Sequence, residues 1–195
     1  MVSRVRHPRR LRRLAALLLA LLLALGVAGP AAADQNDPAL DGLFRDLKEA
    51  QSPERVREIE MRIWGHWFDS GSEEIDRMLH AGDIALSTGR YNHSYALLNG
   101  VIERRPDLAE GWNRRATLRY LIRDYEGSIA DIDETLKREP RHFGALSGLG
   151  LCHLALGNEE EALGAFERAL VHNPHMPGVK RRVEQLLDRL GRHAI

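Results

Sequence analysis

The chain has 195 residues, with 28 basic residues, 28 acidic residues and a single cysteine. Six of the basic residues are arginines within Met1–Ala33, which contains no acid, so the rest carries 22 basic against 28 acidic residues and a net charge of −6. A mildly acidic body argues against nucleic acid or an anionic membrane as the main partner. One cysteine excludes an intramolecular disulfide and a cysteine-based zinc site. We expect Cys152 to be buried, as free cysteines usually are.

The first 33 residues have the pattern of a secretory signal peptide. A basic start, Met1–Arg13, precedes the apolar run Leu14–Val27, and small residues after Gly29-Pro30 suit cleavage before Asp34. The run is shorter than the roughly 20 residues that a membrane-spanning helix needs. We therefore predict a periplasmic protein with no stable membrane insertion after cleavage. The alternative is retention of the segment as an uncleaved inner-membrane anchor.

Residues 34–73 predict a helical hairpin. Apolar residues recur at helical spacing in two stretches, and the Asp37-Pro38 and Ser52-Pro53 pairs suit the start of each helix. We interpret this hairpin as a degenerate repeat unit that covers the N-terminal face of the array behind it. Its aromatic residues are then expected in the core, and an exposed aromatic platform is the alternative. These residues are Trp64, Trp67 and Phe68.

A 34-residue period governs the chain from Ile75 onward, because Pro106, Pro140 and Pro174 stand 34 residues apart. The residues between them resemble the tetratricopeptide repeat, in which leucine and Leu-Gly on one helix precede alanine and phenylalanine on the next, and proline closes the unit. The third unit carries this pattern as Leu146, Leu149, Gly150, Ala162, Phe166 and Pro174. The second unit departs most, because Arg115 and Arg119 occupy slots that are apolar in the family.

The resemblance implies an all-α fold, a right-handed α-solenoid of stacked antiparallel helix pairs. Three units are expected at residues 75–108, 109–142 and 143–176. Residues 177–195 add an amphipathic helix, which we interpret as the cap over the last apolar face.

Two groups of charged or ligating residues could have roles other than packing. One is a cationic cluster in the second unit, which we expect to pair internally with aspartates rather than with a partner's carboxylates. The cluster is Asn113-Arg114-Arg115 with Arg119 and Arg123 beyond it, and the candidate aspartates are Asp124, Asp131 or Asp133. The histidines of the third unit face different ways in a helical hairpin, which disfavours zinc. They are His142, His153, His172 and His175.

Catalytic chemistry finds no support in the sequence. The acidic residues follow surface helical spacing, and no nucleophile elbow, phosphate loop or metalloprotease helix is present. We therefore predict a protein that is not an enzyme and that needs no cofactor.

Binding is the function that the repeat architecture favours. In the family the first helix of each unit lines a concave groove, and the resemblance places six candidate partner-binding residues there. Asn113 and Tyr120 are expected to contribute most, because an amide bonds peptide backbone and a tyrosine suits an interface. Leu79 and Asp83 stand where family members that grip the carboxylate terminus of chaperones have lysine and asparagine, so that clamp is absent. The six are Leu79, Asp83, Glu110, Asn113, Thr117 and Tyr120.

The sequence thus predicts a periplasmic interaction module, an adaptor or assembly factor that binds a protein or peptide in its groove. Two alternatives stay open at this point. One is a self-associating structural protein of the cell envelope, a homo-oligomer in which the ends of the array or Trp64 and Trp67 pair with a second copy. The other is a histidine-based metal carrier.

Overall fold

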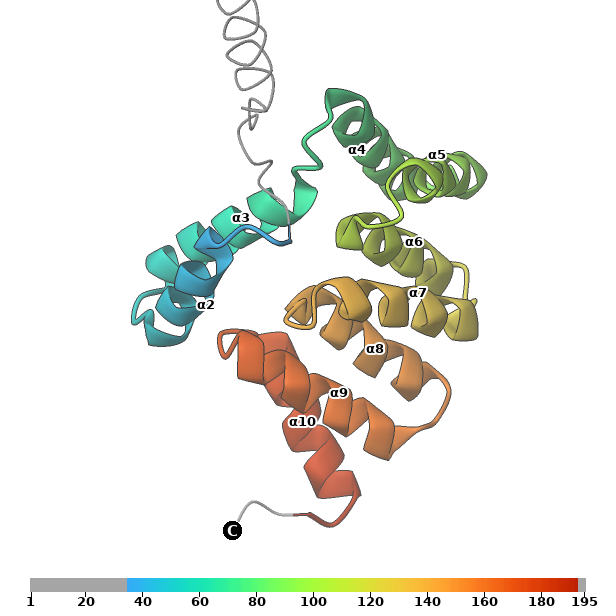
Figure 1. The fold of residues 1–195 in the computed structure, drawn as a ribbon. Coiled ribbons are helices and arrows are strands. Elements are labelled where there is room, and N and C mark those ends of the chain that lie inside the picture. Colours follow the sequence, from blue (N-terminus) through green and yellow to red (C-terminus); the bar gives the residue numbers. More distant parts are fainter. Residues whose placement is uncertain (1–34, 193–195) are drawn as a thin grey trace, which may run out of the picture. The chain divides into compact units, whose positions relative to one another are not determined.

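The computed structural model describes residues 35–192, all of which lie in the compact unit Ala32–Ile195 (Figure 1). The predicted signal peptide lies outside the described residues. Every regular element between residues 35 and 192 is an α-helix. The helices are α2 (Ala39–Glu49), α3 (Pro53–Phe68), α4 (Glu73–Ser87), α5 (Tyr91–Arg104), α6 (Ala109–Leu121), α7 (Tyr125–Arg138), α8 (Phe143–Ala155), α9 (Glu159–His172) and α10 (Pro177–Arg189).

Six of these helices form three successive pairs, α4 with α5, α6 with α7 and α8 with α9 (Figure 1). The second helices of the pairs begin at Tyr91, Tyr125 and Glu159, which are 34 residues apart. The first helices also contact one another, α4 with α6 and α6 with α8. The expected all-α solenoid is confirmed. Among the described helices, none combines the length and the apolar character needed to cross a bilayer.

The turn inside each pair reverses the chain through one left-handed residue. Gly89 and Gly157 have φ of 71° and 81°, which glycine adopts without strain. Arg123 fills the same place in the middle pair with φ of 65°. Asp124 follows it and accepts a hydrogen bond from the Gly127 N–H, so the next helix starts with a capped N-terminus.

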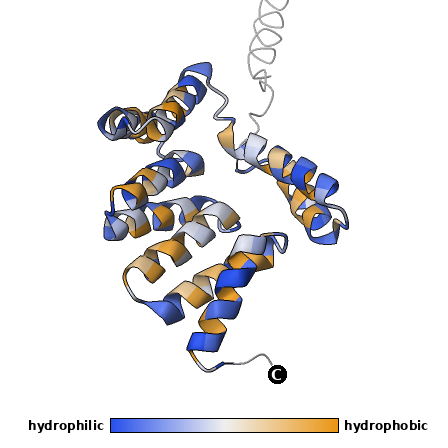
Figure 2. Ribbon diagram, turned by 180° about the vertical axis from the view of Figure 1, so that it is seen from behind, coloured by the Kyte–Doolittle hydropathy of each residue, from blue (hydrophilic) through white to orange (hydrophobic). Residues whose placement is uncertain are grey.

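Apolar stripes on the helices meet between and within the pairs (Figure 2). Packing is tight where α8 crosses α9. A Cβ added to Gly150 would lie 2.5 Å from the fully buried ring of Phe166, so only glycine leaves room for the crossing. Cys152 is fully buried on the same helix, as expected, and its Sγ lies 3.3 Å from Ser128 Oγ.

The last helix, α10, packs on α9. Val179 and Leu186 are buried against Leu163 and Phe166, and the opposite face of α10 carries the charged residues. Apolar surface that a further unit would have covered is thereby removed from water.

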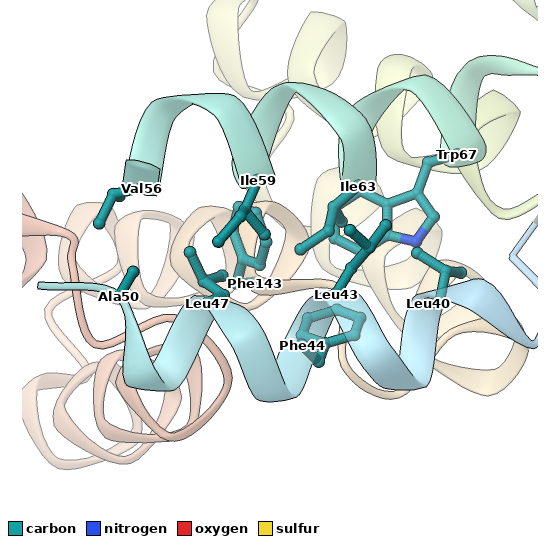
Figure 3. Packing of buried hydrophobic residues seen from close by; sticks show 10 residues of the cluster. All are labelled: Leu40, Leu43, Phe44, Leu47, Ala50, Val56, Ile59, Ile63, Trp67 and Phe143. Carbon is teal, nitrogen blue, oxygen red and sulfur yellow. The ribbon is translucent and has the colours of Figure 1, made fainter. Parts of the chain in front are cut away.

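The hairpin of α2 and α3 has a core of its own (Figure 3). Leucines of α2 interdigitate with Ile59, Ile63 and Trp67 of α3, and Phe143 of α8 is the array residue that joins this cluster of buried side chains. Trp67 is fully buried and Trp64 half-buried, in line with a core role.

The expectation that this hairpin covers the N-terminal face of the array is wrong. Its helix α3 instead contacts α6, and its residues reach the starts of α6 and α8 and the turn before α10. Only the last residues of α3 reach the first unit of the array, where Phe68 packs against the core of α4 and α5. The aromatic rings of α3 pack instead at the start of α8, against His142, Phe143 and the backbone of Gly144.

Candidate functional site: a pocket between the first helices

A pocket of about 190 Å³ opens between α6 and α8, with α7 as its floor. Its lining side chains are uncharged and combine apolar groups with hydroxyls. The lining is Asn113, Ala116, Thr117, Tyr120, Ser128, Ile132, Gly144, Ala145, Ser147, Gly148 and Leu151.

Three of the six sequence-predicted residues lie together in this pocket. Thr117 is exposed, and its hydroxyl donates to the Asn113 carbonyl at 3.0 Å. Tyr120 is half-buried, packs on the ring of Tyr125 at 5.6 Å between centroids, and still lines the pocket. Asn113 is 7% exposed, and its Nδ2 donates to Glu110 Oε2 at 3.0 Å. Part of its hydrogen-bonding capacity is therefore already used inside the protein.

The other three predicted residues do not reach the pocket. Leu79 is fully buried in the core of α4 and α5, so the expectation that it lies on an open inner face is wrong. Glu110 is also fully buried, which corrects its assignment to an open face. Asp83 is partly buried and lies 3.5 Å from Arg114 Nη1.

Glu110 is instead the centre of a buried polar network beside the pocket. Its carboxylate accepts from Arg114 Nε at 2.5 Å and from Asn113, and lies 3.0 Å from His142 Nε2. Because the Ala145 N–H donates to His142 Nδ1, the ring proton must be on Nε2, and this N–H donates to Glu110. Burial raises the pKa of Glu110, but Arg114, the His142 hydrogen bond and Asn113 outweigh it, and the pKa lies below its ordinary value.

The arginines in the apolar slots of the second unit are paired internally, as expected. Arg115 makes a bidentate contact with Asp131 at 2.7 and 2.8 Å and donates to Asn99. Arg119 Nε lies 3.3 Å from Asp131 and 3.7 Å from Asp124. A buried carboxylate from α7 thus replaces the apolar contact that the family places there.

The histidines are spread over separate contacts. His142 bonds Glu110, and His175 Nε2 lies 2.8 Å from the Leu47 carbonyl. Burial lowers the pKa of His172, which lies edge-on to Phe44. Within residues 35–192, no three His, Cys, Asp or Glu side chains gather in a way that could hold a metal ion.

Sequence reasoning missed the role of two glycines that make the pocket hollow and the indole that lies beside one of them. Gly144 and Gly148 leave space on α8, and Trp64 of α3 lies against Gly144, where an added Cβ would be 2.8 Å from the indole. Two glycines four residues apart on a first helix were the available signal. Nothing in the sequence indicated that α3 would lie beside them, because that contact joins residues 80 positions apart.

The fold and the pocket define a class of protein: an all-α solenoid of repeated helix pairs with a hollow between the first helices of two units. The tetratricopeptide repeat family model matches residues 113–177. A TPR repeat-containing protein of Rhizobium etli is 38% identical over 151 residues, which cover 77% of this chain and 74% of that protein. The chain belongs to the tetratricopeptide repeat family.

Solved structures show the same fold. The first TPR domain of Spaghetti (RPAP3), bound to an HSP90 peptide, aligns with a TM-score of 0.59 at 18% identity, over 62% of this chain and 95% of that one. A crystal structure of MamA aligns with a TM-score of 0.57 at 13% identity, over 73% of this chain and 87% of that one.

Proposed function

We propose that this protein is a non-enzymatic interaction module that binds a segment of another protein in the pocket between α6 and α8. The observation that carries the proposal is the pocket itself, which is hollow, uncharged and formed by two successive first helices of the array. Repeat arrays use such surfaces for binding. The family and the peptide-bound neighbour support the same reading.

The lining specifies a neutral side chain as the bound group. Tyr120, Leu151 and Ile132 supply apolar surface, while Thr117 and Ser147 supply hydroxyls that bond peptide backbone. A volume of about 190 Å³ lies below the roughly 300–1,000 Å³ of typical small-molecule pockets, so the pocket suits a single side chain of a bound segment. An acidic chain terminus is disfavoured, since no cation lines the pocket.

The cellular role that we propose is that of an adaptor or assembly factor in the periplasm. The support is the signal-peptide pattern of Met1–Ala33. Self-association through paired tryptophans is less well supported, because Trp67 is fully buried within its own chain.

A photo-crosslinking amino acid at Thr117 tests the proposal in cells that produce the protein. The same group at Lys137, an exposed residue on α7, is the matched control position. We expect a crosslinked protein from position 117 that is absent from position 137. It should disappear when Gly148→Leu fills the pocket and decrease with Tyr120→Ala. Equal capture from both positions, or capture that survives Gly148→Leu, would overturn the proposal.

A further inference from the structure

Helix α3 lies on the inner face of the array as a bound helix would. Trp67 stacks on the His142 ring with centroids 3.9 Å apart and planes 13° apart. Trp64, one turn earlier, packs against Gly144, and the Arg114 guanidinium lies 4.3 Å above the Phe68 ring. We call this surface of α6 and α8 the aromatic seat: Glu110, Arg114, His142, Phe143 and Gly144.

The hairpin is attached to the array through aromatic contacts and through side-chain contacts at its edges. Its buried core comes from its own two helices, with Phe143 the array's contribution (Figure 3). The remaining attachments at its edges include side-chain contacts at chain turns. Asp41 bonds Arg141 at 2.6 Å, and Glu60 bonds Asn173 at 2.6 Å.

Docking also leaves a polar group without a partner. Trp67 Nε1 is buried, its ring stacks on His142, and among the described residues it has no hydrogen-bond partner. An unsatisfied buried polar atom costs free energy in the docked state that release of the hairpin would recover.

We propose that the aromatic seat is a second partner-binding site, that its present occupant is the chain's own α3, and that it recognises an amphipathic helix carrying two aromatic residues three positions apart. The inference rests on the proposed function, since it assigns a partner class to the same inner face. The chemistry is specific: a flat ring stacks on His142, a second ring needs the missing Cβ at Gly144, and Arg114 accepts an aromatic face.

An occupant within the same chain excludes free ligands by its effective concentration, which is in the millimolar range for a short linker. Only residues 69–72 separate α3 from α4. A partner helix therefore gains access when the hairpin is released, so that α3 acts as a built-in competitor.

The test uses residues 34–195 and a fluorescein-labelled peptide with the α3 sequence, Ser52–Asp69. A release variant, Asp41→Ala/Glu60→Ala/Trp64→Ala, removes two edge contacts and one ring contact but keeps the hairpin's own buried core. By fluorescence anisotropy, we expect the peptide to bind the release variant at least tenfold more tightly than the parent. Equal binding to both chains, or binding to neither, would overturn the inference.

Two glycine variants show where the peptide binds. Added to the release variant, Gly144→Leu should abolish peptide binding, because its side chain fills the place of Trp64. Gly148→Leu is the matched control and should leave peptide binding unchanged, since the nearest atom to its Cβ would be Ile132 Cδ1 at 3.5 Å. Peptide binding that survives Gly144→Leu would contradict the seat.

The two proposals can fail separately. If Gly148→Leu abolishes the crosslink from Thr117 but the peptide does not bind the release variant, the pocket proposal stands and the aromatic-seat proposal is rejected. Peptide binding that depends on Gly144, with no specific crosslinking from Thr117, would retain the seat and reject the pocket. Circular dichroism of each variant must match the helical content of the parent for these comparisons to count.

Discussion

At the scale of single residues, the close crossing of α8 and α9 depends on one missing methyl group. Gly150 faces the ring of Phe166, and Phe166 is fully buried, so the ring has no free space to enter. Interiors are packed as densely as organic crystals, and an added carbon must displace its neighbours.

Gly150→Ala should therefore destabilise the protein by about 1–3 kcal/mol, the usual cost of overpacking a core. Gly164→Ala on α9 is the matched control, since a Cβ there would meet nothing within 4 Å. That change should stabilise by about 0.5–1 kcal/mol through the helix propensity of alanine. Urea unfolding followed by circular dichroism measures both, and equal effects would show that the crossing is not tight.

Glu110 is the second residue whose effect can be predicted, because it is ionised while fully buried. Glu110→Gln removes the charge that holds Arg114 and His142, and should destabilise by about 1–3 kcal/mol at pH 7. The pKa of Glu110 is lower in the folded protein than in the unfolded chain, so its ionisation stabilises the fold above the ordinary value of 4.5.

This contribution falls as the pH drops below 4.5, because the unfolded chain then takes up a proton at Glu110 while the folded protein does not, and it is gone once the folded carboxylate is protonated too. In chemical denaturation, the difference in unfolding free energy between parent and Glu110→Gln should therefore stay constant at pH values above 4.5 and narrow as the pH falls below it. A difference that does not narrow below pH 4.5 would show that the charge of Glu110 does not stabilise the fold.

At the scale of elements, Arg115 of α6 ties its helix to α5 and α7 through Asn99 and Asp131. Arg115→Leu should destabilise by about 1–3 kcal/mol, because Asp131 stays buried with Arg119 as its remaining cation. The double variant Arg115→Leu/Asp131→Leu restores apolar contact and should recover most of that loss, as replacement of buried ion pairs often does. Thermal unfolding of the three proteins decides this, and a double variant less stable than the single one would contradict it.

The elements that sequence reasoning placed correctly are those whose signals are local. Gly157, Asp124 and Ser52 end or begin helices through their own backbone conformation or side chain. The 34-residue period likewise identifies the repeat from spacing alone. The position of the hairpin depends instead on Trp67 meeting His142, 75 residues away, and no local pattern encodes that contact.

The candidate site shows the same division. Tyr120, Thr117 and Asn113 follow from their register on a first helix, and the structure brings them to one pocket. Leu79 has the same register in its own unit but is buried, because Val101 and Leu98 of α5 pack over it. The position of a residue in the family pattern alone could not tell a pocket-lining residue such as Asn113 from a core residue such as Leu79.

At the scale of the whole molecule, the array is stable only if its last unit is covered. Leu186 of α10 is fully buried on α9, so Leu186→Asp should release α10 and cost about 2–5 kcal/mol. We expect increased binding of a hydrophobic dye and faster amide exchange in α9. Gln185→Asp, at an exposed position of the same helix, should leave both unchanged. Unaltered dye binding by Leu186→Asp would show that α10 is not a cap.

The attachment of the hairpin to successive turns has a mechanical consequence. Small rotations at each junction between the units of a repeat array add up along the stack, so the array can flex as a whole. Here Gln35 bonds the backbone at Asp107, Asp41 bonds Arg141, and Glu60 bonds Asn173, one contact at each of three turns that close a unit. While the hairpin is docked, these contacts restrain rotation between the units, so a ligand of the pocket between α6 and α8 meets a surface whose ordering entropy was lost on folding rather than on binding.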